Sequence, residues 1–210
     1  MQPESSMRPL RLAVTALMLC LAAQTGAADP LISKSYSYFS VSGRTAADLE
    51  REFSRLGPLL SGTGTRHAGA TRIKLGGSVD YENSDGRCRV TDAKVKLETH
   101  LTLPRWKDRK HASREMALIW DTMSADIKRH EERHAEIARQ YARRLETALE
   151  ALRPEADCAR MQARVDATTK KIVDRHAADQ DRFDRVEAAS YERRMTRMLR
   201  FKAAERQEGG

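Results

Sequence analysis

Forty consecutive residues, Ser113 to Leu152, contain no proline or glycine, and this run restricts the possible folds of the chain more than any other feature. Apolar and aromatic side chains recur in it every three or four residues, the period of one helix face. The series comprises Met116, Trp120, Met123, Ile127, His130, His134, Ile137, Tyr141, Leu145, Ala148 and Leu152. The pattern predicts one long helix that carries two histidines in its apolar face and ends before Pro154.

The two histidines belong to the segment His130-Glu131-Glu132-Arg133-His134, which matches the pattern H-E-x-x-H. Histidines four residues apart project from one helix face and can bind one zinc ion, while the glutamate accepts a proton from water. The alternative is a chance match in a helix rich in glutamate, arginine and histidine. Two imidazoles in an apolar face would then need buried partners, which favours a ligand pair. We therefore predict His130 and His134 as zinc ligands and Glu131 as the general base.

The first 28 residues have the pattern of a secretory signal peptide. Arg8 and Arg11 precede an apolar run over residues 12–23, and small residues end the segment at Ala28. The alternative is an uncleaved anchor, but a membrane-spanning helix needs about 20 apolar residues. We expect a secreted or periplasmic protein with one domain over residues 29–190 and a basic C-terminal helix and tail over residues 191–210.

Cysteine usage agrees with export. Cleavage near residue 28 would remove Cys20 and leave Cys88 and Cys158 as a pair in a compartment that permits oxidation. We predict a disulfide between these two residues, with two free thiols as the alternative.

Strand patterns precede the long helix. Residues 34–41 alternate polar and β-favouring side chains, and residues 45–56 predict a short amphipathic helix that stops at Gly57-Pro58. Residues 71–83 and 87–103 predict a hairpin with its turn at Ser84-Asp85-Gly86. Further helix is expected from about Asp157 to Lys202. The predicted fold is α+β and zincin-like, with a small antiparallel sheet packed on the long helix and followed by C-terminal helices.

Short segments over about residues 35–184 also resemble a known family. They are Tyr36 to Gly43 with Thr45 and Ala46, Arg66 to Thr71, Cys88, Leu103 to Trp106, Trp120, the His130 to His134 motif, and Cys158. In their order and spacing they resemble a bacterial family described as predicted secreted zinc-dependent proteases, a domain of unknown function. The resemblance implies a peptide or protein substrate and a sheet ahead of the active-site helix. Lys94 to Leu103 is the candidate edge strand for binding an extended peptide.

Catalytic zinc usually has a third protein ligand. The family ends in a segment like Tyr-Asp-x-x-Thr-x-His-Gly, but here residues 183–190 replace it and Ala189 stands at the histidine position. Glu187 is the predicted substitute, because it lies two residues from that position and a downstream helical glutamate completes many zincin sites. Asp184 and His176 are the weaker candidates, and the isolated His67, His100 and His111 are expected to be surface histidines.

The C-terminal segment from Arg193 to Lys202 is rich in cations and has a narrow apolar stripe. This helix could rest on an anionic envelope surface, or the stripe could pack on its own domain. Nucleic acid is not an expected partner of an exported chain with 5% aromatic residues. Three hypotheses remain open: a zinc peptidase, a catalytically degenerate relative that binds or scaffolds the envelope, and a helical protein with an accidental motif.

Overall fold

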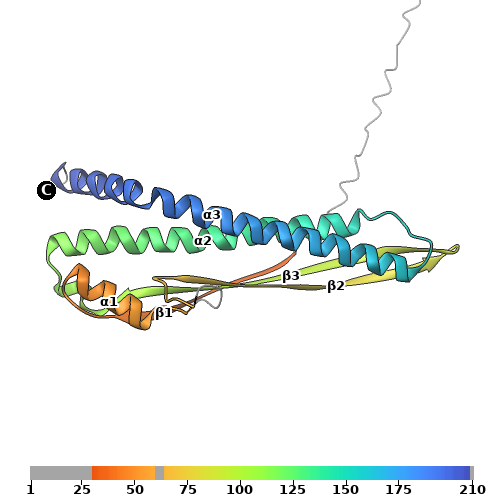
Figure 1. Ribbon diagram of the computed structural model, residues 1–210, viewed down its shortest axis with the longest axis horizontal. Helices are drawn as coiled ribbons and strands as arrows, with labels where there is room; N and C mark the ends of the chain where they lie inside the picture. Colours follow the sequence, from red (N-terminus) through yellow and green to blue (C-terminus); the bar gives the residue numbers. More distant parts are fainter. Residues whose placement is uncertain (1–29, 60–63, 209–210) are drawn as a thin grey trace, which may run out of the picture.

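The computed structural model describes residues 30–59 and 64–208, which form a three-stranded sheet covered on one face by two long helices (Figure 1). The predicted signal peptide, Met1 to Ala28, lies outside these residues and stays a prediction. Within the described ranges, no helix is both long enough and apolar enough to cross a membrane.

The sheet is mixed rather than antiparallel. Its strands are β1 (Leu31–Val41), β2 (Ala70–Ser84) and β3 (Arg87–Trp106), in the order β1-β3-β2. The β2–β3 hairpin is confirmed, with Asp85 and Gly86 at the positive φ angles that its tight turn requires. β1, however, pairs in parallel with β3. The prediction of an antiparallel sheet is therefore wrong for β1. The hairpin makes β3 antiparallel to β2, and β3 inserts next to β1 with the same direction as β1.

β3 is the central strand, which corrects a second prediction. The segment from Lys94 to Leu103 is predicted at a sheet edge, but it pairs with β2 from Lys94 to Thr102 and with β1 from Lys96 onward. The edges of the sheet are β1 and β2. The β2–β3 ladder has one register shift, between Asp80 and Tyr81 of β2, which face Asp92 and Val90 of β3.

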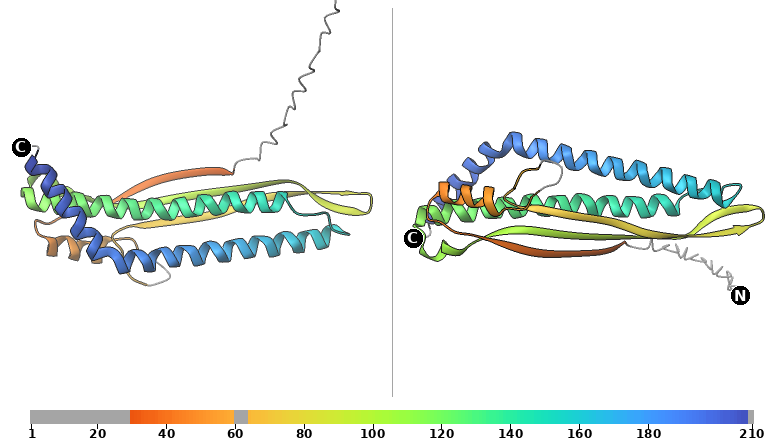
Figure 2. Two further views of the ribbon diagram at one scale, coloured as in Figure 1. Left: turned by 90° about the horizontal axis from the view of Figure 1, so that it is seen from above. Right: turned by 60° about the horizontal axis from the view of Figure 1, so that its bottom comes forward.

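The predicted long helix is α2 (Arg114–Glu150), which begins where the Ser113 side chain accepts a hydrogen bond from the backbone N–H of Met116. α3 (Cys158–Glu208) follows as one continuous helix and lies beside α2 on the same face of the sheet (Figure 2). It crosses residue 190, the predicted domain boundary, without a break. These elements share one core of buried residues: Cys88, Ala93, Val95, Leu97, Ala138, Ala142, Leu145, Leu149, Met161 and Val165.

A second core lies at the other end of the sheet. The predicted short helix is confirmed as α1 (Ala46–Leu56), and Thr45 and Asp48 cap it reciprocally. Leu49 packs with Val41, Trp106 and Trp120 in this cluster. A short 3₁₀ helix, η1 (Lys107–His111), then leads into α2.

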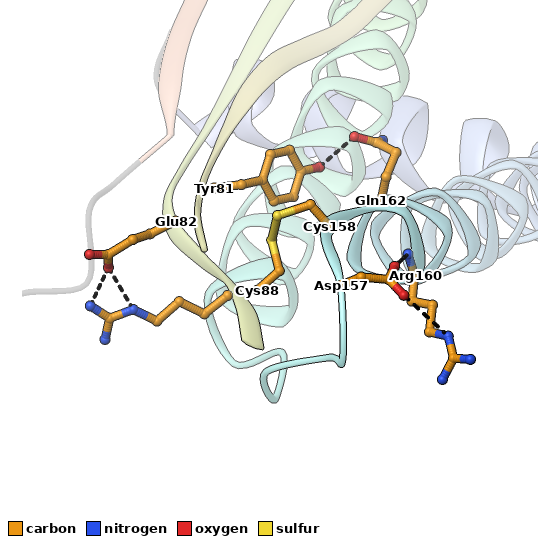
Figure 3. The surroundings of a disulfide bond; sticks show 8 residues. Tyr81, Glu82, Cys88, Asp157, Cys158, Arg160 and Gln162 are labelled. Carbon is orange, nitrogen blue, oxygen red and sulfur yellow. Dashed lines mark hydrogen bonds and ion pairs between the residues drawn. A yellow bond between two sulfur atoms is a disulfide. The ribbon is translucent and has the colours of Figure 1, made fainter. Parts of the chain in front are cut away.

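Cys88 and Cys158 form a disulfide that ties the start of α3 to β3 (Figure 3). The backbone supports the link, because the amides of Cys88 and Glu155 each donate to the other residue's carbonyl oxygen, at 2.9 and 2.8 Å. Tyr81 adds a third tie, since its hydroxyl donates to the side-chain oxygen of Gln162. The strand hairpin and the start of α3 are therefore fastened together at this end of the molecule.

Candidate metal centre

Three donor atoms converge between the middle parts of α2 and α3. The Nε2 atoms of His130 and His134 are 3.0 Å apart. Oδ1 of Asp184 lies 3.3 Å from the first and 3.0 Å from the second. Within the described residues, these three side chains are the group whose donor atoms all lie within 4.8 Å of one another. The H-E-x-x-H spacing brings the two imidazoles together, and α3 supplies the carboxylate.

The donor set and its spacing fit a zinc ion. Two imidazoles and one carboxylate form a known ligand set for catalytic zinc, at bond lengths near 2 Å. Ligand atoms at that distance in a tetrahedron lie about 3.3 Å apart, close to the separations in this cluster. Burial lowers the pKa of His130, and the neighbouring His134 lowers it further. This favours the neutral imidazole that a metal ion requires.

Gln180 lies on α3, one helical turn before Asp184, and its side chain orients His134. Its amide nitrogen donates to the backbone carbonyl of His134 at 3.1 Å, which leaves its oxygen to accept from His134 Nδ1 at 2.6 Å. With the proton held on Nδ1, the Nε2 lone pair faces Asp184 and His130. A side chain that fixes the tautomer in this way is typical of metal-bound histidines.

Glu187, the third ligand favoured by the sequence, lies behind His130. Its carboxylate pairs with Arg129 and, at 3.1 Å, with Arg194, and it is 3.9 Å from the outer nitrogen of His130, Nδ1. The inner nitrogen faces Asp184 instead. This geometry favours Asp184 over Glu187 as the third ligand and gives Glu187 the position of an outer partner to His130.

The charges around Glu187 belong to a network that joins α2 to α3. Asp126 is 5% exposed and accepts hydrogen bonds from Arg129 and from two nitrogens of Arg194. Burial alone would raise the pKa of Asp126, but these hydrogen bonds outweigh it and lower the pKa. The network therefore holds paired charges beside the three donor residues and fixes α3 against α2.

Glu131 is 6% exposed, and its carboxylate contacts the segment that enters β2. The Thr71 hydroxyl lies 2.8 Å from Glu131 Oε2 as a hydrogen-bond donor. Burial raises the pKa of Glu131, and the Thr71 hydrogen bond opposes this only in part. Gly69 packs directly on the carboxylate, because a Cβ at that position would lie 2.9 Å from Oε1. The segment that enters β2 therefore requires glycine where it passes the predicted base.

A cleft of about 320 Å³ opens at this place. One wall is the segment His67-Ala68-Gly69, and the others come from α2 and α3, including His130, Glu131, Asp184 and Tyr191. His67 was expected to be an ordinary surface histidine, yet it lines the cleft. Phe183 packs on both imidazoles, with its ring stacked on His130 at 4.9 Å and edge-on to His134 at 5.1 Å.

The remaining predicted residues lie outside the donor cluster. His176 contacts Gln180 at 2.9 Å and is not a member of the metal-binding group. His100 lies on the sheet between the hydroxyls of Ser35 and Ser37. In the C-terminal helix, Met195, Met198 and Leu199 are half-buried while the arginines at 193, 197 and 200 are exposed. Contact of this basic face with an anionic surface stays a prediction.

Replacing Asp184 by alanine is expected to weaken zinc binding by more than about 100-fold, since a direct ligand should matter more than an outer partner, whose loss costs 10- to 100-fold. Glu187→Gln alters only an outer partner and should weaken zinc binding by no more than about 10- to 100-fold. Competition titration with a chromophoric chelator measures both. The reverse order of effects would restore Glu187 as the third ligand.

Gln180→Leu is expected to weaken zinc binding about 10- to 100-fold, because His134 loses the acceptor that keeps the proton on Nδ1. Gln180→Glu keeps an acceptor at the same place and should retain most of the affinity. The same chelator titration tests the pair. Equal affinities for the leucine and glutamate variants would show that Gln180 does not orient His134.

Sequence reasoning missed Gln180, Gly69 and Phe183. One signal for the first was available, because Gln180, Asp184 and Glu187 have the i, i+4, i+7 spacing of one helix face. The role of Gly69 depends on a contact between segments about 60 residues apart, which no local pattern records.

A family model described as "Bacterial protein of unknown function (DUF922)" matches residues 36–191. The match includes the three donor residues, Glu131, the cleft wall and both bridged cysteines. Its description assigns no activity. No curated protein matches the chain, and no solved structure matches it.

Proposed function

This chain belongs to the bacterial DUF922 family, and on that premise we propose that it is an exported zinc-dependent hydrolase with a peptide or protein substrate. The observation that carries the proposal is the convergence of His130, His134 and Asp184 beside a buried glutamate at a cleft. Ionisable groups with shifted pKa values that gather in a cleft are typical of catalytic sites, and the pKa values of His130 and Glu131 are shifted here. Export rests on the sequence of the first 28 residues alone, and the zincin-like classification rests on the H-E-x-x-H helix.

In this proposal His130, His134 and Asp184 hold zinc. The ion would supply Lewis-acid chemistry toward water and a scissile carbonyl. Glu131 acts as the general base: Thr71 holds its Oε2, which leaves Oε1 to accept the proton from water. The raised pKa makes the carboxylate a stronger base than an exposed glutamate, because proton affinity rises with pKa. The protonated carboxyl can then deliver the same proton to the leaving amine.

Other residues position these groups. Gln180 keeps the His134 Nε2 lone pair directed at the donor cluster, and Phe183 packs against both imidazole rings. Gly69 leaves the space that Glu131 occupies. A substrate chain would enter between the 67–69 segment and α3, where the cleft opens.

A catalytically degenerate scaffold is the second candidate. The observation in its favour is that a protonated imidazole of His130 or His134 can pair with the Asp184 carboxylate, at 3.3 or 3.0 Å, without a metal ion. Ala189 at the position of the family's histidine is consistent with loss of activity. In this case the protein would bind the envelope, with the basic helix from Arg193 to Lys202 as a possible contact to an anionic surface.

Metal analysis of the purified protein distinguishes the two candidates. We expect about one zinc ion per chain, because three ligands with an open fourth position are the usual arrangement of a catalytic site. His130→Ala should lose the ion, while His100→Ala, which alters a histidine outside the cluster, should keep it. Absence of bound zinc in the unmodified protein, even after incubation with excess metal, would contradict the enzyme proposal.

A further inference from the structure

β1 is an edge strand that carries exposed apolar side chains. Nine large apolar residues are exposed in the described part of the chain, and four of them lie on this strand: Leu31, Ile32, Tyr36 and Tyr38. β1 pairs only with β3, so the amides and carbonyls on its other side have no backbone partner among the described residues. Its eleven residues contain no proline, glycine or bulge. An open edge of this length can accept another strand.

The sequence of β1 is nearly symmetric about Ser35. Two copies that run antiparallel with Ser35 opposite Ser35 place like side chains together. The other opposed pairs are Leu31 with Phe39, Ile32 with Tyr38, Ser33 with Ser37, and Lys34 with Tyr36. Apolar residues thus face apolar residues, hydroxyls face hydroxyls, and an ammonium group faces an aromatic ring. Each of these is a favourable cross-strand pair.

The charged side chain of β1 already has a partner within its own copy. Lys34 pairs with Glu132 of α2 at 2.7 Å, and Tyr36 also donates a hydrogen bond to that carboxylate. A groove of about 710 Å³ runs between β1 and α2, with Ile32, Leu97 and Ala135 among its lining residues. Lys34 is the one charged residue of β1, so a strand added along this edge would meet no unpaired charge of the strand itself.

We infer that two copies of this chain associate through β1 in a symmetric dimer, in which the two three-stranded sheets join into one. The interface is self-complementary and closed, since each copy offers the same strand in opposite directions. The proposed catalytic cleft lies at the start of β2, the opposite edge of the sheet, so dimerisation leaves both clefts open. The inference is independent of whether the chain binds zinc.

Light scattering after size exclusion tests the dimer. The full-length chain should have the mass of two chains. Ser35→Glu should lower the measured mass to that of one chain, because two carboxylates would then face each other across the two-fold axis. Within one copy, the new carboxylate still has His100 beside it, since Ser35 contacts His100 Nδ1 at 2.9 Å. The matched control is Ser78→Glu, an exposed serine on the other edge strand, which should leave the dimer intact.

A cysteine variant keeps the test valid if Ser35→Glu fails to fold. With Cys20 replaced by serine in every chain, Ser35→Cys should give a disulfide-linked dimer on mild oxidation, because directly opposed antiparallel residues lie within disulfide reach. Ser78→Cys should remain monomeric on a non-reducing gel. A chain of single mass at every concentration, or equal cross-linking at positions 35 and 78, would overturn the inference.

Discussion

Glu131→Gln is expected to lower the rate of peptide hydrolysis by about 10² to 10⁴-fold, the usual contribution of a general base. The substitution removes the proton acceptor but keeps the size of the side chain. An amide oxygen can still accept the Thr71 hydrogen bond that now reaches Glu131 Oε2 at 2.8 Å. The zinc content should stay at about one ion per chain, because Glu131 is not in the donor cluster. Activity on a peptide library and metal analysis of the same preparation give both readouts.

The neighbouring glutamate provides a matched control. Glu132 has the same chemistry on the same helix turn, but it faces β1, where it pairs with Lys34 and Tyr36. Glu132→Gln should therefore keep most of the hydrolytic activity. If hydrolysis is unchanged in Glu131→Gln, Glu131 is not the base. If it falls equally in both variants, the loss reflects the helix rather than one carboxylate.

Replacing both bridged cysteines by alanine is expected to lower the free energy of unfolding by about 4 kcal/mol. The disulfide closes a loop of 70 residues, and the chain-entropy model gives a value of this size for a loop of that length. In a protein of this size the change corresponds to a fall in Tm of roughly 8 to 16 °C. Urea unfolding of the variant and of the unreduced protein measures the difference.

Reduction of the unmodified protein supplies the companion measurement. It should reproduce most of the loss, because both treatments release the same loop. The backbone hydrogen bonds between Cys88 and Glu155 survive either treatment, so the ends of the loop stay close in the folded state. A loss below about 1 kcal/mol would show that the unfolded chain already keeps these segments together.

The local elements of the fold could be predicted from the sequence. The period of three or four residues, interrupted by no proline or glycine, predicted α2, and Ser84-Asp85-Gly86 predicted the hairpin. Strand order could not be predicted in this way. Whether β3 lies between β1 and β2 depends on how α1 packs and on how the chain enters β2, and neither leaves a local pattern. The parallel pairing of β1 and the central position of Lys94 to Leu103 follow from that order.

In the candidate site, too, the residues within one helix could be predicted from the sequence, and the residues that α3 contributes could not. His130, Glu131 and His134 lie within five residues of one helix, so their spacing alone brings two imidazoles together. The contribution of α3 depends on how far that helix has slid and turned against α2. Position in the sequence favoured Glu187, whereas the rotation of α3 turns Asp184 toward the histidines and Glu187 toward two arginines. Three residues along a helix correspond to nearly one turn, a difference that only the packing resolves.

The disulfide at the start of α3 therefore fixes the point from which the position of Asp184 along the helix is set. Asp184 lies 26 residues beyond Cys158 on the same unbroken helix, a distance of about 39 Å at 1.5 Å per residue. Insertion of one residue between them would carry the carboxylate about 1.5 Å along the axis and turn it by about 100°. The number of residues between Cys158 and Asp184 thus determines whether the carboxylate reaches the histidines. Insertions or deletions in this stretch should therefore be tolerated far less than substitutions on its exposed face.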